Sequence, residues 1–242
     1  MDIYSKWLVK QFIAHRGLHN DVFPENSLGA FQNAIDNNYA IELDVHELDD
    51  GTMAVFHDDK LARMTGVDGY IGNLTAADLK AIRLLNTEYG IPTFNETLDF
   101  VAGRTPLLIE IKNTNKVGGL EKKILDALKE YNGEYAVQSF NPYSIEYFKN
   151  NAPHILRGQL SCFFRGTKIS AFRRIVLRNM LLNKSTKPDF ISYDFGDLPN
   201  RFVKKYPGRP VLAWTIRSDS DMERALPYCD NIIFEGFIPK RG

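Results

Sequence analysis

The chain has 242 residues, of which 44% are hydrophobic and 25% charged, a composition typical of a globular protein with a sizeable core. Thirty basic and thirty acidic residues give a formal net charge of zero, so no global charge favours nucleic acid or an anionic membrane as a partner. The two cysteines are too few for a disulfide framework. The start of the chain has no long apolar run and no segment reaches the length of a membrane span, so we expect a reducing, cytoplasmic setting.

Short runs of apolar residues bounded by turns predict strands along the whole chain. Residues 41–45 alternate apolar and acidic side chains, the period-two pattern of a strand, and 11–14 has the profile of a buried strand. Residues 52–56 return as a hairpin strand after a turn at 49–51. Apart from that hairpin, we expect eight main strands, which cover 11–14, 41–45, 106–112, 135–140, 156–162, 189–193, 210–216 and 231–235.

Helices are predicted between these strands by capping residues and by apolar side chains at helical spacing. Ser27 and Ser218 are candidate caps, and Pro142 suits the first position of a helix. Strands that alternate with helices predict a parallel sheet, and eight such units in this length predict a closed (β/α)8 barrel of the TIM type. An open doubly wound sheet is the alternative, but no Gly-x-Gly-x-x-Gly follows a strand. One expected helix starts after Ser27 and another starts at Pro142. The other expected helices cover 96–102, 119–131, 169–182, 200–205 and 218–226.

Residues 59–95 interrupt the alternation. They contain four glycines, a capping-type sequence at 75–78 and a turn at 90–92. Their apolar residues suggest that the segment packs on the main body and is not a linker. We therefore expect one barrel domain over 1–242 with an inserted subdomain at about 59–95, anchored by Leu61, Ile71, Leu74, Leu79, Ile82 and Leu84.

Acidic side chains gather at the C-terminal ends of the predicted strands, where barrels carry functional groups. Glu42 and Asp44 lie two apart on one strand and share a face, and Glu110 would join them. Close carboxylates raise each other's pKa unless a cation neutralises them, and Mg²⁺ or Ca²⁺ takes such oxygen ligands. The three carboxylates therefore predict a divalent metal site with positions open for substrate and water. The side chain of His46 is expected on the same face as Glu42 and Asp44, but it lies further along the strand, outside the expected ligand set.

Cations and histidines complete this set. Arg16 and Lys112 would add positive charge, which is useful only for an anionic ligand. His15 and His57 can divide proton transfer between a base and an acid, because each has a pKa near neutrality. Trp214 lies near the end of the seventh strand. Singly, each residue also fits a structural role, such as an ion pair between strand neighbours, but together they describe phosphodiester cleavage.

The stretch 163–187 carries seven basic residues among apolar ones. A basic amphipathic helix can touch an anionic lipid surface, so membrane contact stays open. We favour an ordinary outer barrel helix with a solvated face. The basic residues are Arg165, Lys168, Arg173, Arg174, Arg178, Lys184 and Lys187.

A series of short motifs runs through nearly the whole chain. They are Ala14-His15-Arg16-Gly17, Pro24-Glu25-Asn26-Ser27, Glu42-Leu-Asp44-Val45, Asp50-Gly51, His57-Asp58, Leu61-x-Arg63-x-Thr65-x-x-x-Gly69, Ile91-Pro92-Thr93, Ile109-Glu110-Ile111-Lys112, Gln138-Ser139-Phe140 and Ala213-Trp214-Thr215. These motifs resemble those of the glycerophosphodiester phosphodiesterases, and the first half of the chain is the more specific part. The last strand departs from the family pattern, because it reads Phe234-Glu235-Gly236 where a Thr-Asp pair is usual.

The resemblance implies a TIM-type barrel with a small domain inserted after the second strand. It also implies a divalent metal, an acid–base pair of histidines, and cations that contact phosphate. The residues concerned are Glu42, Asp44 and Glu110 as metal ligands, His15 and His57 as the catalytic pair, and Arg16 and Lys112 at the phosphate, to which we add Trp214 as a substrate contact.

We therefore predict metal-dependent hydrolysis of a glycerophosphodiester to sn-glycerol 3-phosphate and an alcohol. A lysophospholipase D-type enzyme that acts on acylated substrates is one alternative, for which the basic stretch is the only hint. A non-catalytic phosphodiester-binding module is another, but binding alone needs no paired acid and base. The sequence leaves open the alcohol, the choice of metal, which histidine is the acid, and the oligomeric state.

Overall fold

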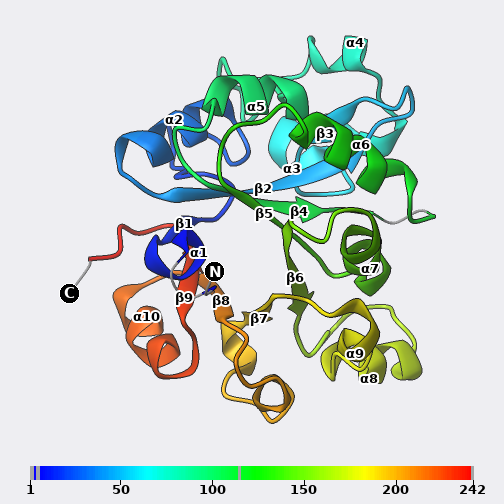
Figure 1. Cartoon of the computed structure of the whole chain (residues 1–242). Coiled ribbons are helices and arrows are strands. Elements are labelled where there is room, and N and C mark those ends of the chain that lie inside the picture. The colour runs from blue at the N-terminus through cyan, green and yellow to red at the C-terminus, as the bar shows by residue number, and fades with distance from the viewer. Residues whose placement is uncertain (1–2, 4–5, 114–115, 241–242) are drawn as a thin grey trace. The chain divides into compact units, whose positions relative to one another are not determined.

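The computed structural model of the chain describes residues 3, 6–113 and 116–240 (Figure 1). The start of the chain, whose lack of a long apolar run underlies the expected cytoplasmic setting, lies partly outside these residues. The chain divides into two compact units. One is Ala14–Tyr135; the other, here called the C-terminal unit, runs from Ala136 onward and includes the N-terminal segment up to Ile13. The assignment of a single domain with an inserted subdomain stays a prediction.

Strand β2 (Ala40–Glu47) organises the sheet of the Ala14–Tyr135 unit. It pairs in parallel with β4 (Leu107–Ile111) and antiparallel with β3 (Met53–Val55), as the predicted strand and hairpin require. The parallel register places Asp44 directly beside Glu110. The sheet alone therefore brings two of the three predicted metal ligands together.

The helices of this unit begin at side-chain caps. The hydroxyl of Ser27 accepts a backbone N–H in the first turn of its helix, which confirms the predicted cap. Thr93 and Glu96 form a capping box that starts the next helix ahead of the expected 96–102. The three helices are α2 (Leu28–Asp36), α5 (Phe94–Val101) and α6 (Gly119–Leu128).

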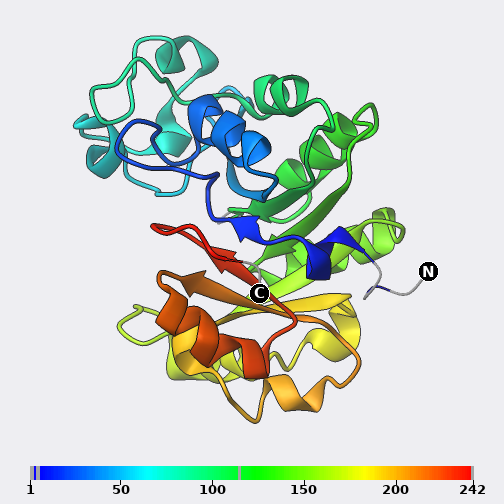
Figure 2. The same ribbon diagram turned by 90° about the vertical axis from the view of Figure 1, so that its left-hand side faces the viewer.

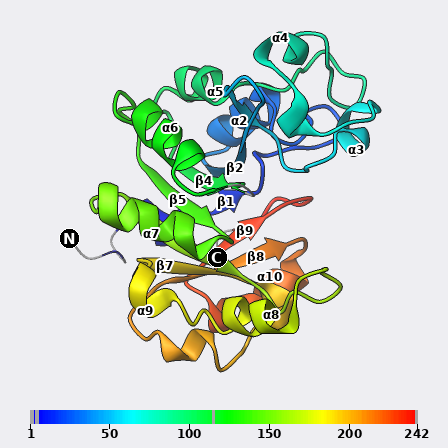
Figure 3. The same cartoon turned by 90° about the vertical axis from the view of Figure 1, so that its right-hand side faces the viewer.

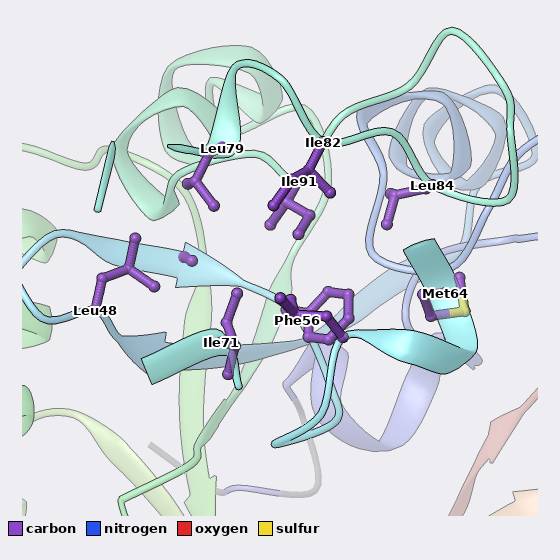
Figure 4. Packing of buried hydrophobic residues seen from close by; sticks show 10 residues of the cluster. Leu48, Phe56, Met64, Ile71, Leu79, Ile82, Leu84 and Ile91 are labelled. Carbon is purple, nitrogen blue, oxygen red and sulfur yellow. The ribbon is translucent and has the colours of Figure 1, made fainter. Parts of the chain in front are cut away.

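The segment between β3 and α5 packs around an apolar cluster of its own. It folds as α3 (Ala62–Thr65), the 3-10 helix Ile71–Asn73 and α4 (Ala76–Leu79), joined by loops. In Figure 4 its side chains surround Phe56 at the end of the hairpin. Burying a Leu or Ile side chain stabilises a fold by about 1.5–3 kcal/mol, so this segment is bound to the hairpin and is not a linker. Of the predicted anchors, Leu74 is partly buried and the others are buried, namely Leu61, Ile71, Leu79, Ile82 and Leu84.

The C-terminal unit contains a ladder of parallel strands. Each strand pairs with the next one along the chain, as the alternation of strands and helices predicted. The N-terminal helix α1 (Trp7–Lys10) lies against this ladder, and Asn231 donates hydrogen bonds to the carbonyls of Leu8 and Gln11. The strands are β5 (Tyr135–Ser139), β6 (Leu156–Ser161), β7 (Phe190–Asp194), β8 (Val211–Ile216) and β9 (Asn231–Phe234).

Helices connect these strands, with two departures from expectation. The predicted helix over 169–182 is shorter and is followed by a separate turn of helix, because Met180 adopts a left-handed backbone conformation. The segment 200–205 forms only a 3-10 helix at Val203–Lys205. Figure 3 shows α7 beside α9, and Figure 2 shows α10 on β8. The helices are α7 (Pro142–Asn151), α8 (Ala171–Arg178), α9 (Asn183–Thr186) and α10 (Asp219–Ala225).

Candidate active site

Three buried carboxylates meet at β2 and β4 of the Ala14–Tyr135 unit. Glu42 is 1% exposed, Asp44 is fully buried and Glu110 is 6% exposed. Each offers one oxygen atom, and these atoms lie within 4.8 Å of one another. The structure thus brings together the three residues that the sequence predicted as metal ligands.

The charges in this cluster do not balance. Burial, followed by Asp44 and Glu110, raises the pKa of Glu42 well above its ordinary value. Burial also raises the pKa of Glu110, although Lys112 opposes it. Burial acts in the same direction on Asp44, but Lys112 and His57 outweigh it and hold the pKa of Asp44 below its usual range. Glu42 is therefore the carboxyl group that the protein's own cations neutralise least.

The donor set fits a hard divalent cation. All three candidate ligands are carboxylates, the oxygen donors that Mg²⁺ and Ca²⁺ prefer. Among the described residues, the buried atom Oε1 of Glu42 has no hydrogen-bond partner. A buried polar atom without a partner is costly, and a bound cation would satisfy it while reducing the repulsion between the carboxylates.

Lys112 and Arg16 lie against the same carboxylates. Lys112 Nζ is 2.6 Å from Glu110 Oε1 and 3.0 Å from Asp44 Oδ1. The Nε atom of Arg16 is 3.7 Å from Asp44 Oδ2, and its Nη1 donates to Glu25 Oε1 at 2.9 Å. The ion pair between Glu110 and Lys112, which the sequence left open, therefore forms. Arg16 and Lys112, the two residues predicted to contact phosphate, both lie next to the carboxylate cluster.

The backbone around Arg16 is held in an uncommon conformation. Arg16 follows β1 (Ile13–Ala14) at a φ of 56°, and its N–H donates to Glu42 Oε2 at 3.0 Å. Asn26 has a φ of 55°; its N–H donates to the Arg16 carbonyl and its side-chain amide donates to Asp44 Oδ2 at 2.9 Å. Such conformations persist where surrounding contacts enforce them, often at functional sites. Asn26 therefore orients a candidate metal ligand, a role that we did not assign from the sequence.

His57 is held by the residue that follows it. Its Nδ1 lies 2.6 Å from Asp58 Oδ1, which assigns the ring proton to Nδ1 and leaves Nε2 as a proton acceptor. Burial lowers the pKa of His57, although Asp44 opposes the shift, so the neutral imidazole is favoured. His46 lies behind this residue, with its Nε2 3.1 Å from the His57 carbonyl. The other candidate histidine, His15, places Nε2 3.9 Å from Glu42 Oε2.

One guanidinium, that of Arg63, connects the partner of His57 with the partner of Arg16. Arg63, from α3, donates through Nε to Asp58 Oδ2 at 2.6 Å and through Nη2 to Glu25 Oε1 at 2.6 Å. Glu25 in turn binds Arg16, and Asp58 binds His57. Against the effect of burial, Arg63 and then His57 lower the pKa of Asp58 to about 2. The family motifs contain Arg63, but no local pattern indicated that it bridges residues so far apart in the chain.

A cleft of about 590 Å³ opens beside Lys112. Its volume lies within the range of small-molecule sites. Residues from the hairpin, the inserted segment and the start of α6 line it, so the insertion contributes directly to the surroundings of the charged cluster. The polar lining includes His46, Asp49, Asp59, Tyr70 and Asn113.

Trp214 and Gln138 belong to the C-terminal unit. The ring of Trp214 packs edge-on against Phe140, with centroids 5.6 Å apart, and within the described ranges its indole N–H has no hydrogen-bond partner. Gln138 is buried and accepts a hydrogen bond from Ser192 at 2.7 Å. Contact between Trp214 and substrate stays a prediction.

Comparisons with known proteins agree with the family resemblance of the motifs. The model of the Glycerophosphoryl diester phosphodiesterase family matches residues 15–234. The glycerophosphodiester phosphodiesterase of Caldanaerobacter subterraneus is 36% identical over 160 residues, which cover 61% of this chain and 65% of that relative. The human lysophospholipase D GDPD1 is 31% identical over 140 residues, 52% of this chain and 43% of the relative. The match thus covers just under two thirds of the first relative's length and less than half of the second's.

Among solved structures, a phosphodiesterase of Oleispira antarctica in complex with the product sn-glycerol-3-phosphate is similar to this chain. The TM-score is 0.75 at 26% identity, and the match covers 93% of this chain and 92% of the other. Together with the family match, this confirms the predicted fold class, a TIM-type barrel of eight parallel strands with helices between them. In the part of the chain that the structure describes, no helix is long and apolar enough to cross a membrane.

Proposed function

This chain belongs to the glycerophosphoryl diester phosphodiesterase family, and on that premise we propose that it hydrolyses glycerophosphodiesters to sn-glycerol 3-phosphate and an alcohol. One observation carries the proposal: the Ala14–Tyr135 unit brings three buried carboxylates, two cations and two histidines together. A module that only binds phosphodiesters needs no pair of groups able to accept and donate protons.

The carboxylates of Glu42, Asp44 and Glu110 would hold the divalent ion, Mg²⁺ or Ca²⁺. When bound, such an ion supplies positive charge that polarises a phosphoryl oxygen of the substrate. Asn26 keeps the Asp44 carboxylate oriented through its hydrogen bond to Oδ2. The ordering of that ligand is thus built into the protein.

We assign the two proton transfers to the two histidines by their partners. Asp58 holds Nδ1–H of His57, so Nε2 accepts the proton of the attacking hydroxyl, which belongs to water or to the neighbouring glycerol carbon. As the new P–O bond forms, the ester P–O bond to the alcohol breaks. Attack by water gives glycerol 3-phosphate directly, whereas attack by the glycerol hydroxyl gives a cyclic phosphate that a water molecule then opens to glycerol 3-phosphate. His15, whose Nε2 lies 3.9 Å from Glu42 Oε2, gives its proton to the departing alkoxide.

Arg16 and Lys112 act on the phosphate itself. Both border the carboxylate cluster, and their positive charges offset the negative charge that develops on the phosphoryl oxygens in the transition state. The cleft beside Lys112 has room for the polar end of the substrate. Its Asp49 and Asp59 side chains suit an alcohol with a cationic group, such as choline or ethanolamine.

The test is release of glycerol 3-phosphate from glycerophosphocholine and glycerophosphoethanolamine by chelator-stripped protein, with Mg²⁺ or Ca²⁺ restored separately. We expect activity only with added metal, and none in Glu42→Gln. Asp126→Asn is the matched control, because the Asp126 carboxylate is exposed, pairs with Lys122 and Lys129, and lies outside the carboxylate cluster and the cleft. Silence of the folded protein with every ion, or full activity of Glu42→Gln, would contradict the proposal.

A second candidate is hydrolysis of lysophospholipids in the manner of a lysophospholipase D. The likeness to the human lysophospholipase D GDPD1 favours it. Adding lysophosphatidylcholine to the same panel separates the two, because the first proposal predicts faster turnover of the deacylated diester. Faster turnover of the acylated substrate would transfer the assignment to the second candidate.

A further inference from the structure

Helix α8 of the C-terminal unit directs two of its apolar side chains outward, while Val176 and Leu177 are half-buried. Phe172 is 75% exposed and Ile175 is 49% exposed, whereas Arg174 and Arg178 are half-buried. All eight residues of α8 are described, and none of them is buried. The helix therefore differs from the expected outer barrel helix with a charged solvated face, because its exposed residues include Phe172 and Ile175 as well as Arg173.

The arginines that turn inward have partners there. The guanidinium of Arg178 lies over the rings of Phe163 and Phe202, at 5.6 and 5.2 Å from their centroids. Arg174 donates to the carbonyl of Thr167 at 3.2 Å. These contacts fix the rotation of α8 about its axis and so fix the outward position of the apolar side chains. Leu181, just after the helix, is also 49% exposed.

The same segment is strongly basic. Residues 163–188 contain seven basic residues and no aspartate or glutamate, in a chain whose charges balance only as a whole. From another element, Asp197 pairs with Arg165. Four of the remaining cations are exposed, so positive charge surrounds the apolar side chains; they are Lys168, Arg173, Lys184 and Lys187.

We propose that α8 docks this protein on an anionic phospholipid bilayer. Phe172 and Ile175 enter the boundary between headgroups and acyl chains, and the exposed cations lie at the level of the lipid phosphates. A bilayer with anionic lipids supplies both chemistries that this surface displays, an apolar interior and a negative plane. A second copy of the chain does not, because a two-fold pairing of this surface with itself would oppose cation to cation.

Vesicle sedimentation with the full chain tests the proposal. We expect binding to vesicles that contain phosphatidylglycerol, little binding to pure phosphatidylcholine, and weaker binding as salt is raised. Phe172→Ser/Ile175→Ser should reduce partitioning by roughly tenfold or more through loss of buried apolar area. The matched control is Ile238→Ser in the same unit, since Ile238 is 56% exposed and lies outside α8.

A series of charge substitutions tests the contribution of the exposed cations to vesicle binding. Arg173→Gln/Lys184→Gln should weaken binding to anionic vesicles by roughly fivefold for each cation removed. Lys10→Gln/Lys80→Gln removes the same net charge at exposed positions outside the segment and should change binding little. Equal binding of both double variants, or no binding of the unaltered protein to anionic vesicles, would overturn the proposal. So would a dimer in solution that Phe172→Ser dissociates.

Discussion

Arginine is used in opposite ways in two regions of this molecule. In the Ala14–Tyr135 unit, Arg16 and Arg63 bind carboxylates, and their contacts connect the candidate catalytic groups. In α8, Arg174 donates to a backbone carbonyl and Arg178 lies over aromatic rings, while the apolar Phe172 and Ile175 are exposed. The partner, more than the residue type, decides the role. Substitutions in the first region should therefore lower catalytic activity. Substitutions on the outer face of α8 should change only the binding of the protein to anionic vesicles.

The largest expected effect comes from Asp44→Asn. It removes the charge of a candidate metal ligand and leaves Lys112 with one carboxylate fewer, so we expect activity to fall about a thousandfold or more, the upper scale for a single electrostatic group. Asp126→Asn is the control, because this exposed carboxylate pairs only at the surface with Lys122 and Lys129. Steady-state rates with glycerophosphocholine check the prediction, and equal rates for the two variants would refute it.

His57→Gln should lower the turnover number by roughly two to four orders of magnitude, the usual range for a general acid or base. The amide keeps a hydrogen-bonding group near Asp58 but cannot accept the proton. His154→Gln, at an exposed position, should leave turnover unchanged. Near-complete activity of the His57 variant would remove this residue from the mechanism.

Arg63→Lys tests a positioning role. A lysine cannot bond Glu25 and Asp58 at once with the geometry of a guanidinium, so we expect a loss of about 10–100-fold in turnover, the scale for outer contacts of a site. The pKa of Asp58, followed by NMR, should rise from about 2 toward the ordinary aspartate value of roughly 3.9. Arg83→Lys, also in the inserted segment, is the control. An unchanged Asp58 pKa would contradict the role.

The smallest effect on folding is expected at α8. Phe172→Ser should change the free energy of unfolding by no more than about 0.5 kcal/mol, because the ring is already exposed. By contrast, Ile71→Ala removes a buried anchor of the inserted segment and should cost about 2–5 kcal/mol. Chemical denaturation of both variants makes the comparison, and a large loss in Phe172→Ser would mean that α8 packs against more than the structure describes.

Local patterns predict most of the elements and the cluster of three carboxylates. The alternation over 41–45 predicts that Glu42 and Asp44 share a face, and the sequence predicts Ser27 as a helix cap, which its contact confirms. These features depend on residues that are close in the sequence, so periodicity and capping rules can predict them.

Other features depend on distant partners. Asn26 binds Asp44 across 18 residues and Arg63 binds Glu25 across 38, and no single-sequence pattern encodes such pairs. The amphipathic pattern of α8 was visible, but the pattern did not tell which face is turned inward. Stacking of Arg178 on Phe163 and Phe202 reverses the usual assignment, and only the tertiary structure contains those contacts.

Calorimetric titration of Mg²⁺ and Ca²⁺ into chelator-stripped protein tests the central claim most directly, that Glu42, Asp44 and Glu110 form a metal site. The account predicts one binding site in the unaltered protein and in Asp126→Asn, with affinity at least about tenfold weaker in Glu42→Gln. Equal affinity in all three proteins, or no binding of either ion to the unaltered folded protein, would contradict it.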